Sequence, residues 1–318
     1  MTSRHLVDAD LQSFIAAFPP LELSGETLHR RRAEMSALIR ELRHPDAACQ
    51  CAEVMIPGPG NAGQLRVLVL RPKNATGVLP AVLHLHGGLY VMGSADDSEL
   101  QNQMRVRELG CVVVSVDYRL APETPFPGPL EDCYAALCWL KKYASELNVD
   151  ARRIAVVGES AGGGLAAALS LLARDRAEVA VAFQQLIYPM LDDRTGSTLD
   201  PNPHAGEFVL TRATNRTAWR MYLNREPGAA LTAGYASAAR ALDLARLPPA
   251  HISIGALDLF VCESIEYARR LVVSGVPAEL HVFPGAVHAF DMSFTKGVAE
   301  RFTRGHLDAL GRGLGIAR

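Results

Sequence analysis

The stretch Gly158-Glu159-Ser160-Ala161-Gly162 decides the fold, because it joins a predicted strand to a predicted helix. The apolar run over 154–157 before it is typical of a buried strand. The run over 163–173 after it is rich in helix formers and free of proline. A serine in such a turn has a strained backbone that exposes its Oγ and crowds its neighbours, so glycine is needed at 158 and 162. We therefore expect Ser160 to be a nucleophile at the start of a helix, where free N–H groups favour negative charge.

A serine hydroxyl alone is a weak nucleophile, so Ser160 predicts a base, an acid that orients the base, and amide donors for an oxyanion. His288 lies in the loop after a predicted strand over 279–283, and Asp258 lies in the loop after a predicted strand over 251–255. Loops that follow parallel strands gather at one edge of the sheet, which is the edge that carries the serine. The sequence therefore predicts a triad of Ser160, Asp258 and His288.

A glycine pair, Gly87-Gly88, follows another predicted strand, over 81–85. Glycines in this position let backbone N–H groups face a pocket, and together with the amide of Ala161 they predict an oxyanion hole. His86, directly before the pair, is interpreted as an anchor of the loop and not as the base. Glu263 is a weaker candidate for the orienting acid.

Strands and helices alternate from about residue 80 to the end of the chain. Continuous apolar strands that alternate with helices predict a mostly parallel sheet covered on both faces. The strands are predicted over 81–85, 111–116, 154–157, 182–188, 251–255 and 279–283, with a loop between the first two. An antiparallel hairpin over 52–56 and 64–70 precedes them. Its turn matches G-x-G-x-x-G, but a strand follows where a dinucleotide site needs a helix, so no such cofactor is predicted.

These motifs together resemble the hormone-sensitive-lipase-like family of α/β hydrolases, in its bacterial carboxylesterase branch. The resemblance covers about residue 50 to the end. It is carried by His86-Gly87-Gly88, the stretch over 158–163, Tyr118 to Glu123, Phe126-Pro127, Glu131-Asp132, Leu247 to Ala250, Asp258, and Gly285 to His288 followed by Phe290.

The resemblance implies an α/β-hydrolase fold with a helical cap. Residues 1–48 and an inserted segment over 192–236 would form the cap, and residues 49–191 and 237–318 would form the two parts of the core. It also implies that the backbone amides of Gly87, Gly88, Leu89 and Ala161 bind the oxyanion. The chain departs from the family at two positions, because Leu89 replaces a third glycine and Glu159 replaces the usual Asp or Thr.

The expected function is hydrolysis of carboxylic esters with short- to medium-chain acyl groups, through an acyl-enzyme and without a metal or an organic cofactor. Two alternatives stay open. One is amide or lactam hydrolysis by the same triad. The other is a catalytically silent ligand-binding receptor, which is expected to lack the base, whereas His288 is present in this chain.

The composition argues against several classes of partner. The chain has 318 residues, 32 of them basic and 34 acidic, and a net charge of −2, so no nucleic-acid partner is predicted. The basic cluster over 29–32 shares its predicted helix with acidic residues, and we expect it to form a solvent-exposed face of mixed charge. No apolar run reaches the length of a membrane span.

The N-terminal residues lack the apolar segment of a signal peptide, and the six cysteines form no disulfide pattern. Four of them fall within apolar patterns and are expected to be buried thiols: Cys111, Cys133, Cys138 and Cys262. These features predict a cytoplasmic protein. The pair Cys49-Gln50-Cys51 is too short for a metal site. The predicted strand over 279–283 is the last one, and at a sheet edge it could pair with a second copy to form a homodimer.

Overall fold

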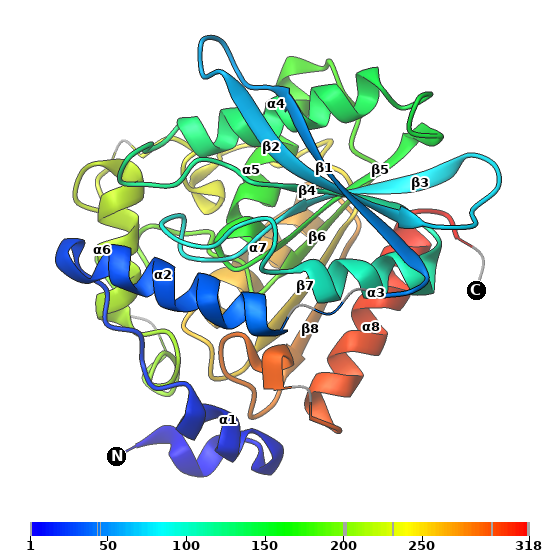
Figure 1. Ribbon diagram of the computed structural model, residues 1–318. Helices are drawn as coiled ribbons and strands as arrows, with labels where there is room; N and C mark the ends of the chain where they lie inside the picture. The colour runs from blue at the N-terminus through cyan, green and yellow to red at the C-terminus, as the bar shows by residue number, and fades with distance from the viewer. Residues whose placement is uncertain are drawn as a thin grey trace.

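An eight-stranded sheet runs through the protein in the order β1-β2-β4-β3-β5-β6-β7-β8, as the computed structural model shows (Figure 1). The structure describes residues 2–42, 44, 46–199, 202–230, 232–293 and 295–316. The strands are β1 (Cys49–Pro57), β2 (Gln64–Pro72), β3 (Leu79–Leu85), β4 (Val112–Val116), β5 (Val149–Glu159), β6 (Phe183–Ile187), β7 (Ala250–Gly255) and β8 (Ala278–Phe283).

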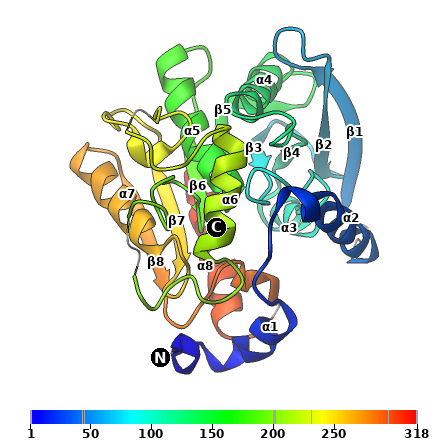
Figure 2. The same cartoon turned by 90° about the vertical axis from the view of Figure 1, so that its left-hand side faces the viewer.

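The strands from β3 onward are parallel, and β1 and β2 form the predicted antiparallel hairpin. Every residue of β4, β6 and β7 is buried, because helices cover the sheet on both faces. The helices α3 (Glu99–Leu109) and α8 (Val298–Gly313) pack together on one face. The helices α4 (Gly128–Lys142) and α5 (Ala161–Arg176) pack together on the other face, where α7 (Val261–Val273) covers β7 and β8 (Figure 2). The predicted fold class is confirmed.

The helix α3 is absent from the sequence prediction, which placed only a loop between the first two parallel strands. It was missed because its buried face is polar: Asn102, Gln103 and Arg105 are all buried. An apolar stripe is the usual signal for a helix, and in this helix the buried apolar residues are limited to Val106 and Leu109 near its end. Its polar side chains instead contact one another and buried polar groups on the central strands β3 and β5.

Three helices precede or interrupt the core: α1 (Gln12–Ala17), α2 (Gly25–Leu42) and α6 (Arg212–Leu223). Short 3-10 helices lie at Ser3–Leu6, Ala9–Leu11, Ala238–Arg240 and Phe290–Ser293. α2 crosses in front of the sheet beside α6, and α1 lies below them (Figure 1). Side chains from 14–39 and from 209–210 face the same cavity as Ser160, so both regions lie over the carboxyl edge of the strands.

The basic cluster over 29–32 is only in part the solvent-exposed face that was expected. Arg30 and Arg31 pair with Glu34 at the surface. Arg32 instead turns toward the core, where its guanidinium donates to the carbonyls of Val91 and Ala121. A helix has more than one face, so adjacent arginines meet different surroundings.

Three of the four cysteines expected to be buried lie wholly or partly inside, but Cys262 is exposed on α7. It lies on the outer side of that amphipathic helix, so the apolar residues around it in the sequence do not cover it. No disulfide links any of the six cysteines, all of which lie in the described ranges. Across those same ranges, no helix combines the length and apolar character needed to span a membrane.

Candidate active site

Ser160 lies at the turn between β5 and α5 with φ of 56° and ψ of −117°, a backbone conformation that L-residues rarely adopt. The two flanking glycines are required by close backbone approach. A Cβ on Gly158 would lie 2.1 Å from the Gly162 carbonyl oxygen, and a Cβ on Gly162 would lie 2.0 Å from the Leu85 carbonyl oxygen. The turn therefore has the crowded geometry that the sequence predicted, and it projects the serine oxygen above the sheet edge.

Three polar side chains from separate loops form one hydrogen-bonded chain. His288 Nε2 lies 2.9 Å from Ser160 Oγ, and His288 Nδ1 lies 2.7 Å from Asp258 Oδ2. All three residues are at most 7 % exposed. In this arrangement the hydroxyl donates to Nε2 and the Nδ1–H donates to the carboxylate, which fixes the imidazole tautomer that can accept a proton from the serine. The structure thus brings together the three residues that the sequence singled out.

Aromatic rings and a backbone amide hold the imidazole and its acid in place. The ring of His288 meets the rings of Tyr188 and Phe260 edge to face, at centroid distances of 4.9 and 5.4 Å. The backbone N–H of Phe260 donates to Asp258 Oδ1 at 3.0 Å. Each carboxylate oxygen of Asp258 therefore has its own donor, and the imidazole has little freedom to rotate.

The glycine loop after β3 lines the cavity around Ser160 through Gly87, Gly88 and Leu89. Gly88 has φ of 118°, and a Cβ there would lie 2.0 Å from the Met92 carbonyl oxygen. Leu89 also has a positive φ, 61°, so a side chain stands in a conformation that glycine adopts more easily. Ala161 is the first residue of α5, and its amide therefore lies among the N–H groups that have no partner inside the helix.

His86 anchors the glycine loop, as expected, and does not contact the serine hydroxyl. Its Nδ1 lies 2.7 Å from the Gly87 carbonyl oxygen, and its ring stacks on Tyr118 at 4.1 Å. The Tyr118 hydroxyl donates to the His86 carbonyl oxygen at 2.7 Å. Burial lowers the pKa of His86, which keeps the ring neutral. Nearby, Arg119 and Asp132 form an ion pair with a shortest distance of 2.7 Å.

Glu159, next to the nucleophile, belongs to a buried polar network that the sequence reasoning missed. Its carboxylate accepts from Arg105 at 2.6 Å and lies 2.7 Å from His84 Nε2. Burial raises the pKa of Glu159, but the facing His84 and Arg105 outweigh it and hold that pKa below its usual range. The network joins β3, α3 and β5 directly beneath Ser160.

Glu263, the weaker candidate for the acid, braces a different loop. Its carboxylate accepts from the backbone amides of Leu191 and Asp192 and from the Thr195 hydroxyl. Burial raises the pKa of Glu263 well above its usual value. It makes no contact with His288, so the structure favours Asp258 as the acid that faces the imidazole.

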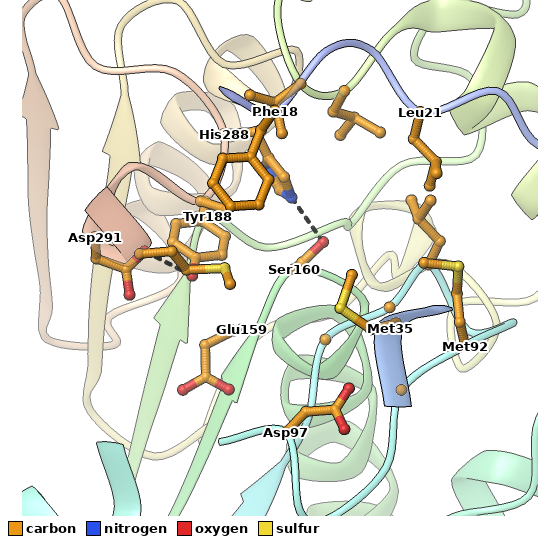
Figure 3. Close-up of a pocket in the computed structure, with 18 of the residues that line it drawn as sticks. Phe18, Leu21, Met35, Met92, Asp97, Glu159, Ser160, Tyr188, His288 and Asp291 are labelled. Atoms are coloured by element: carbon orange, nitrogen blue, oxygen red, sulfur yellow. Dashed lines mark hydrogen bonds between the residues drawn. The ribbon is translucent and has the colours of Figure 1, made fainter. Parts of the chain in front are cut away.

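A cavity of about 280 Å³ opens onto Ser160 and His288. Apolar side chains from the N-terminal region, among them Phe18, Leu21 and Met35, form much of its wall together with Met92 of the loop after β3 (Figure 3). A second polar pair lies in the same wall, where the Tyr188 hydroxyl donates to Asp291 at 2.9 Å. Burial raises the pKa of Asp291 to about 6. This pair was also missed, although Asp291 follows His288 by three residues in the same loop.

Among the residues that the structure describes, no set of side chains spaced to hold a metal lines the cavity. Within the described ranges, the group of His, Cys, Asp and Glu residues that could ligate an ion comprises His251, Glu279 and His281, none of which lines this cavity. The site around Ser160 therefore carries a nucleophile, a base and an acid, with amides nearby.

Comparison with known proteins identifies the family of this chain. Residues 82–292 match the family model described as alpha/beta hydrolase fold. The chain is 34 % identical over 278 residues to esterase LipI of Mycobacterium tuberculosis, covering 85 % of this chain and 84 % of LipI. It is 32 % identical over 278 residues to ethyl acetate hydrolase of Pseudomonas putida, covering 86 % and 85 %.

The solved structure of a bacterial heroin esterase superposes with a TM-score of 0.91 at 38 % identity, covering 98 % of this chain and 99 % of that one. Similarity of this extent spans the helical regions before and within the core as well as the sheet. The resemblance found from the motifs is confirmed.

Proposed function

This chain belongs to the hormone-sensitive-lipase-like family of α/β hydrolases, and we propose that it is a carboxylesterase that uses Ser160, Asp258 and His288. The observation that carries the proposal is the unbroken hydrogen-bonded chain from the serine oxygen through the imidazole to the carboxylate. The relatives named above as esterases support ester bonds as the substrate class.

In the proposed reaction, His288 Nε2 takes the proton of Ser160 Oγ as that oxygen attacks the ester carbonyl carbon. Asp258 holds the Nδ1–H and stabilises the imidazolium that forms. The imidazolium then gives its proton to the departing alkoxide, which leaves as an alcohol. A water molecule, deprotonated by the same base, attacks the acyl-enzyme and releases the carboxylic acid.

The negative charge on the tetrahedral oxygen is assigned to the amides of Gly87, Gly88, Leu89 and Ala161. Support comes from the glycine loop facing the same cavity as Ser160 and from the position of Ala161 at the start of α5. Fixed amide dipoles aimed at a developing oxyanion are worth about 3 kcal/mol or more per donor. A backbone amide serves equally well at Leu89, so the leucine costs the site no donor.

The acyl group is proposed to be short or of medium length. A cavity of about 280 Å³ holds a small ester and leaves little room for a long chain. We assign residues 1–48 and 192–236 to a cap over residues 49–191 and 237–318, the hydrolase core. Apolar side chains of the cap segments, such as Phe18 and Leu210, would contact the ester.

A homodimer through β8 is a further part of the proposal. β8 is an edge strand, and exposed apolar side chains lie close to that edge: Val272 and Val273 at the end of α7, and Val282 on β8 itself. A second copy would cover this surface by continuing the sheet across a two-fold axis. Light scattering is expected to give twice the chain mass, and a monomer mass would refute the dimer. The absence of disulfides suits the reducing cytoplasm, which we propose as the compartment.

The direct test of the activity is hydrolysis of p-nitrophenyl acetate by the wild type and by Ser160→Ala. The wild type should release p-nitrophenol, and the variant should lose at least about a thousandfold in kcat because no acyl-enzyme can form. Equal turnover by both proteins would refute the assignment of the nucleophile. The matching p-nitroanilide tests the amidase alternative, since a carboxylesterase should hydrolyse it far more slowly than the ester.

A further inference from the structure

A second group of chemically capable side chains lies near the amino ends of β7 and β8. The parallel register pairs His251 with Glu279, and Ser253 with His281. Side chains alternate between the two faces of a sheet, so His251, Glu279 and His281 share one face. The ligand atoms that these three side chains offer all lie within 4.8 Å of one another.

His251 is the buried member of the group, at 1 % exposed, and its Nε2 has no hydrogen-bond partner in the described part of the chain. Its Nδ1 lies 3.5 Å from the Gln185 amide nitrogen, at the outer limit of a hydrogen bond. A buried polar nitrogen without a strong partner destabilises the folded state, and native structures rarely leave one. The ring therefore lacks the partner that its burial requires.

The other two members reach the surface and can move. The side chains of Glu279 and His281 are 43 % and 40 % exposed, and His281 Nε2 lies 2.7 Å from Glu279 Oε1. The second carboxylate oxygen accepts from Arg312 of α8 at 2.6 Å. A solvent-borne ion can thus reach the group directly, in competition with the guanidinium of Arg312.

We propose that His251, Glu279 and His281 bind one divalent transition-metal ion, with water completing the coordination. Two imidazole nitrogens and one carboxylate oxygen suit Zn²⁺, which prefers such ligands in a tetrahedral arrangement. Bonds of about 2.0–2.2 Å place tetrahedral ligand atoms roughly 3.3 Å apart. The two half-exposed side chains can reach this spacing by rotation, while the buried imidazole stays fixed.

The charge state of the buried ligand fits this assignment. An imidazole must be neutral to bind a metal. Burial lowers the pKa of His251 to about 4, so the ring is neutral at physiological pH. The bound metal would link β7 to the edge strand β8 and stabilise the end of the sheet.

The site is separate from the catalytic one. Asp258 and His288 follow the carboxyl ends of β7 and β8, whereas His251 and Glu279 are the second residues of these strands. At about 3.3 Å per residue, His251 and Glu279 lie roughly 13 Å before the carboxyl ends of their strands, and none of the three ligands lines the catalytic cavity. Metal binding should therefore change stability and leave ester hydrolysis unchanged.

The experiment is a calorimetric titration of ZnCl₂ into the full chain without an affinity tag, after EDTA treatment and dialysis. We expect one ion per chain with a dissociation constant on the order of 1–10 μM. At a hundredfold excess over that constant, Zn²⁺ should raise the Tm by about 5 °C. The kcat for p-nitrophenyl acetate should be the same with and without the ion.

Variants of the two half-exposed ligands test the site without removing a buried side chain, so these proteins should still fold. His281→Ala and Glu279→Gln should each weaken Zn²⁺ binding at least about tenfold and remove the rise in Tm. Arg312→Gln should tighten binding, because it removes the competing cation. His204→Ala, an exposed histidine elsewhere, is the control and should bind Zn²⁺ like the wild type. Undiminished binding by His281→Ala, or no stoichiometric binding by the wild type, would overturn the proposal.

Discussion

At the scale of single residues, two carboxylates beside Ser160 differ in charge state because their partners differ. Glu159 faces Arg105 and His84 in a buried network, and these two side chains hold its pKa below the usual range. Asp291 has the neutral hydroxyl of Tyr188 as its side-chain partner, and burial raises its pKa to about 6. The first acid is therefore charged throughout the physiological range, and the second changes its charge just below it.

The titration of Asp291 gives a prediction about stability. Its pKa rises from 3.8 in the unfolded chain to about 6 in the folded protein, so the folded state binds the proton more tightly. Its contribution to stability is then present below about pH 4 and is lost as the pH rises through 6. Asn cannot ionise, so Asp291→Asn should gain stability relative to the wild type as the pH rises.

Thermal unfolding at about pH 4.5 and about pH 8 measures this. The Tm of Asp291→Asn minus that of the wild type should be larger at pH 8 by a few degrees. The same difference at both pH values would mean that Asp291 titrates like an exposed aspartate.

At the scale of elements, Arg32 fastens α2 to the core. Its guanidinium donates to the carbonyls of Val91 and Ala121 and binds both carboxylate oxygens of Glu123 at 2.8 Å. Arg32 lowers the pKa of Glu123 to about 2, so this ion pair persists at physiological pH. The helix α2 places Met35 and Ile39 in the cavity wall. It is therefore held to the core by the polar contacts of Arg32 as well as by apolar packing.

Arg32→Ala should loosen α2 without disturbing the triad. The variant should lose on the order of 1 kcal/mol of the free energy that holds α2 over the cavity. This loss corresponds to roughly a fivefold rise in KM, with kcat little changed. Hydrogen exchange should become faster in α2 and stay unchanged in β5 and β7.

The control for this variant is Arg30→Ala, on the same helix, whose exposed guanidinium pairs only with Glu34 among the described residues. It should match the wild type in both KM and exchange. Equal behaviour of the Arg30 and Arg32 variants would show that the polar attachment does not hold the helix.

At the scale of the whole molecule, topology explains what the sequence could predict. Asp258 and His288 were found from the rule that active groups follow the carboxyl ends of parallel strands, and the structure places both side chains at that edge. Glycines at 158 and 162 were found from the backbone geometry of a tight turn. Such features depend on the local residue pattern and on the order of strands and helices, and both can be predicted from the sequence.

Other contacts depend on which distant groups meet in space, and no local pattern encodes them. The carbonyls that bind Arg32 lie 59 and 89 residues away. The helix α3 buries polar residues against Glu159, so its sequence lacks a continuous apolar stripe. Asp291 meets a tyrosine 103 residues earlier in the chain. In each case a polar group is satisfied by tertiary structure alone.

The central claim is that the imidazole of His288 activates Ser160. A fluorophosphonate probe tests this most directly, because it bonds covalently to a serine whose proton a base removes. Mass spectrometry should find one adduct per chain, on Ser160, and His288→Ala should slow labelling by at least about a hundredfold. Labelling of Ser160 at the same rate in both proteins, or none in the wild type, would contradict the account.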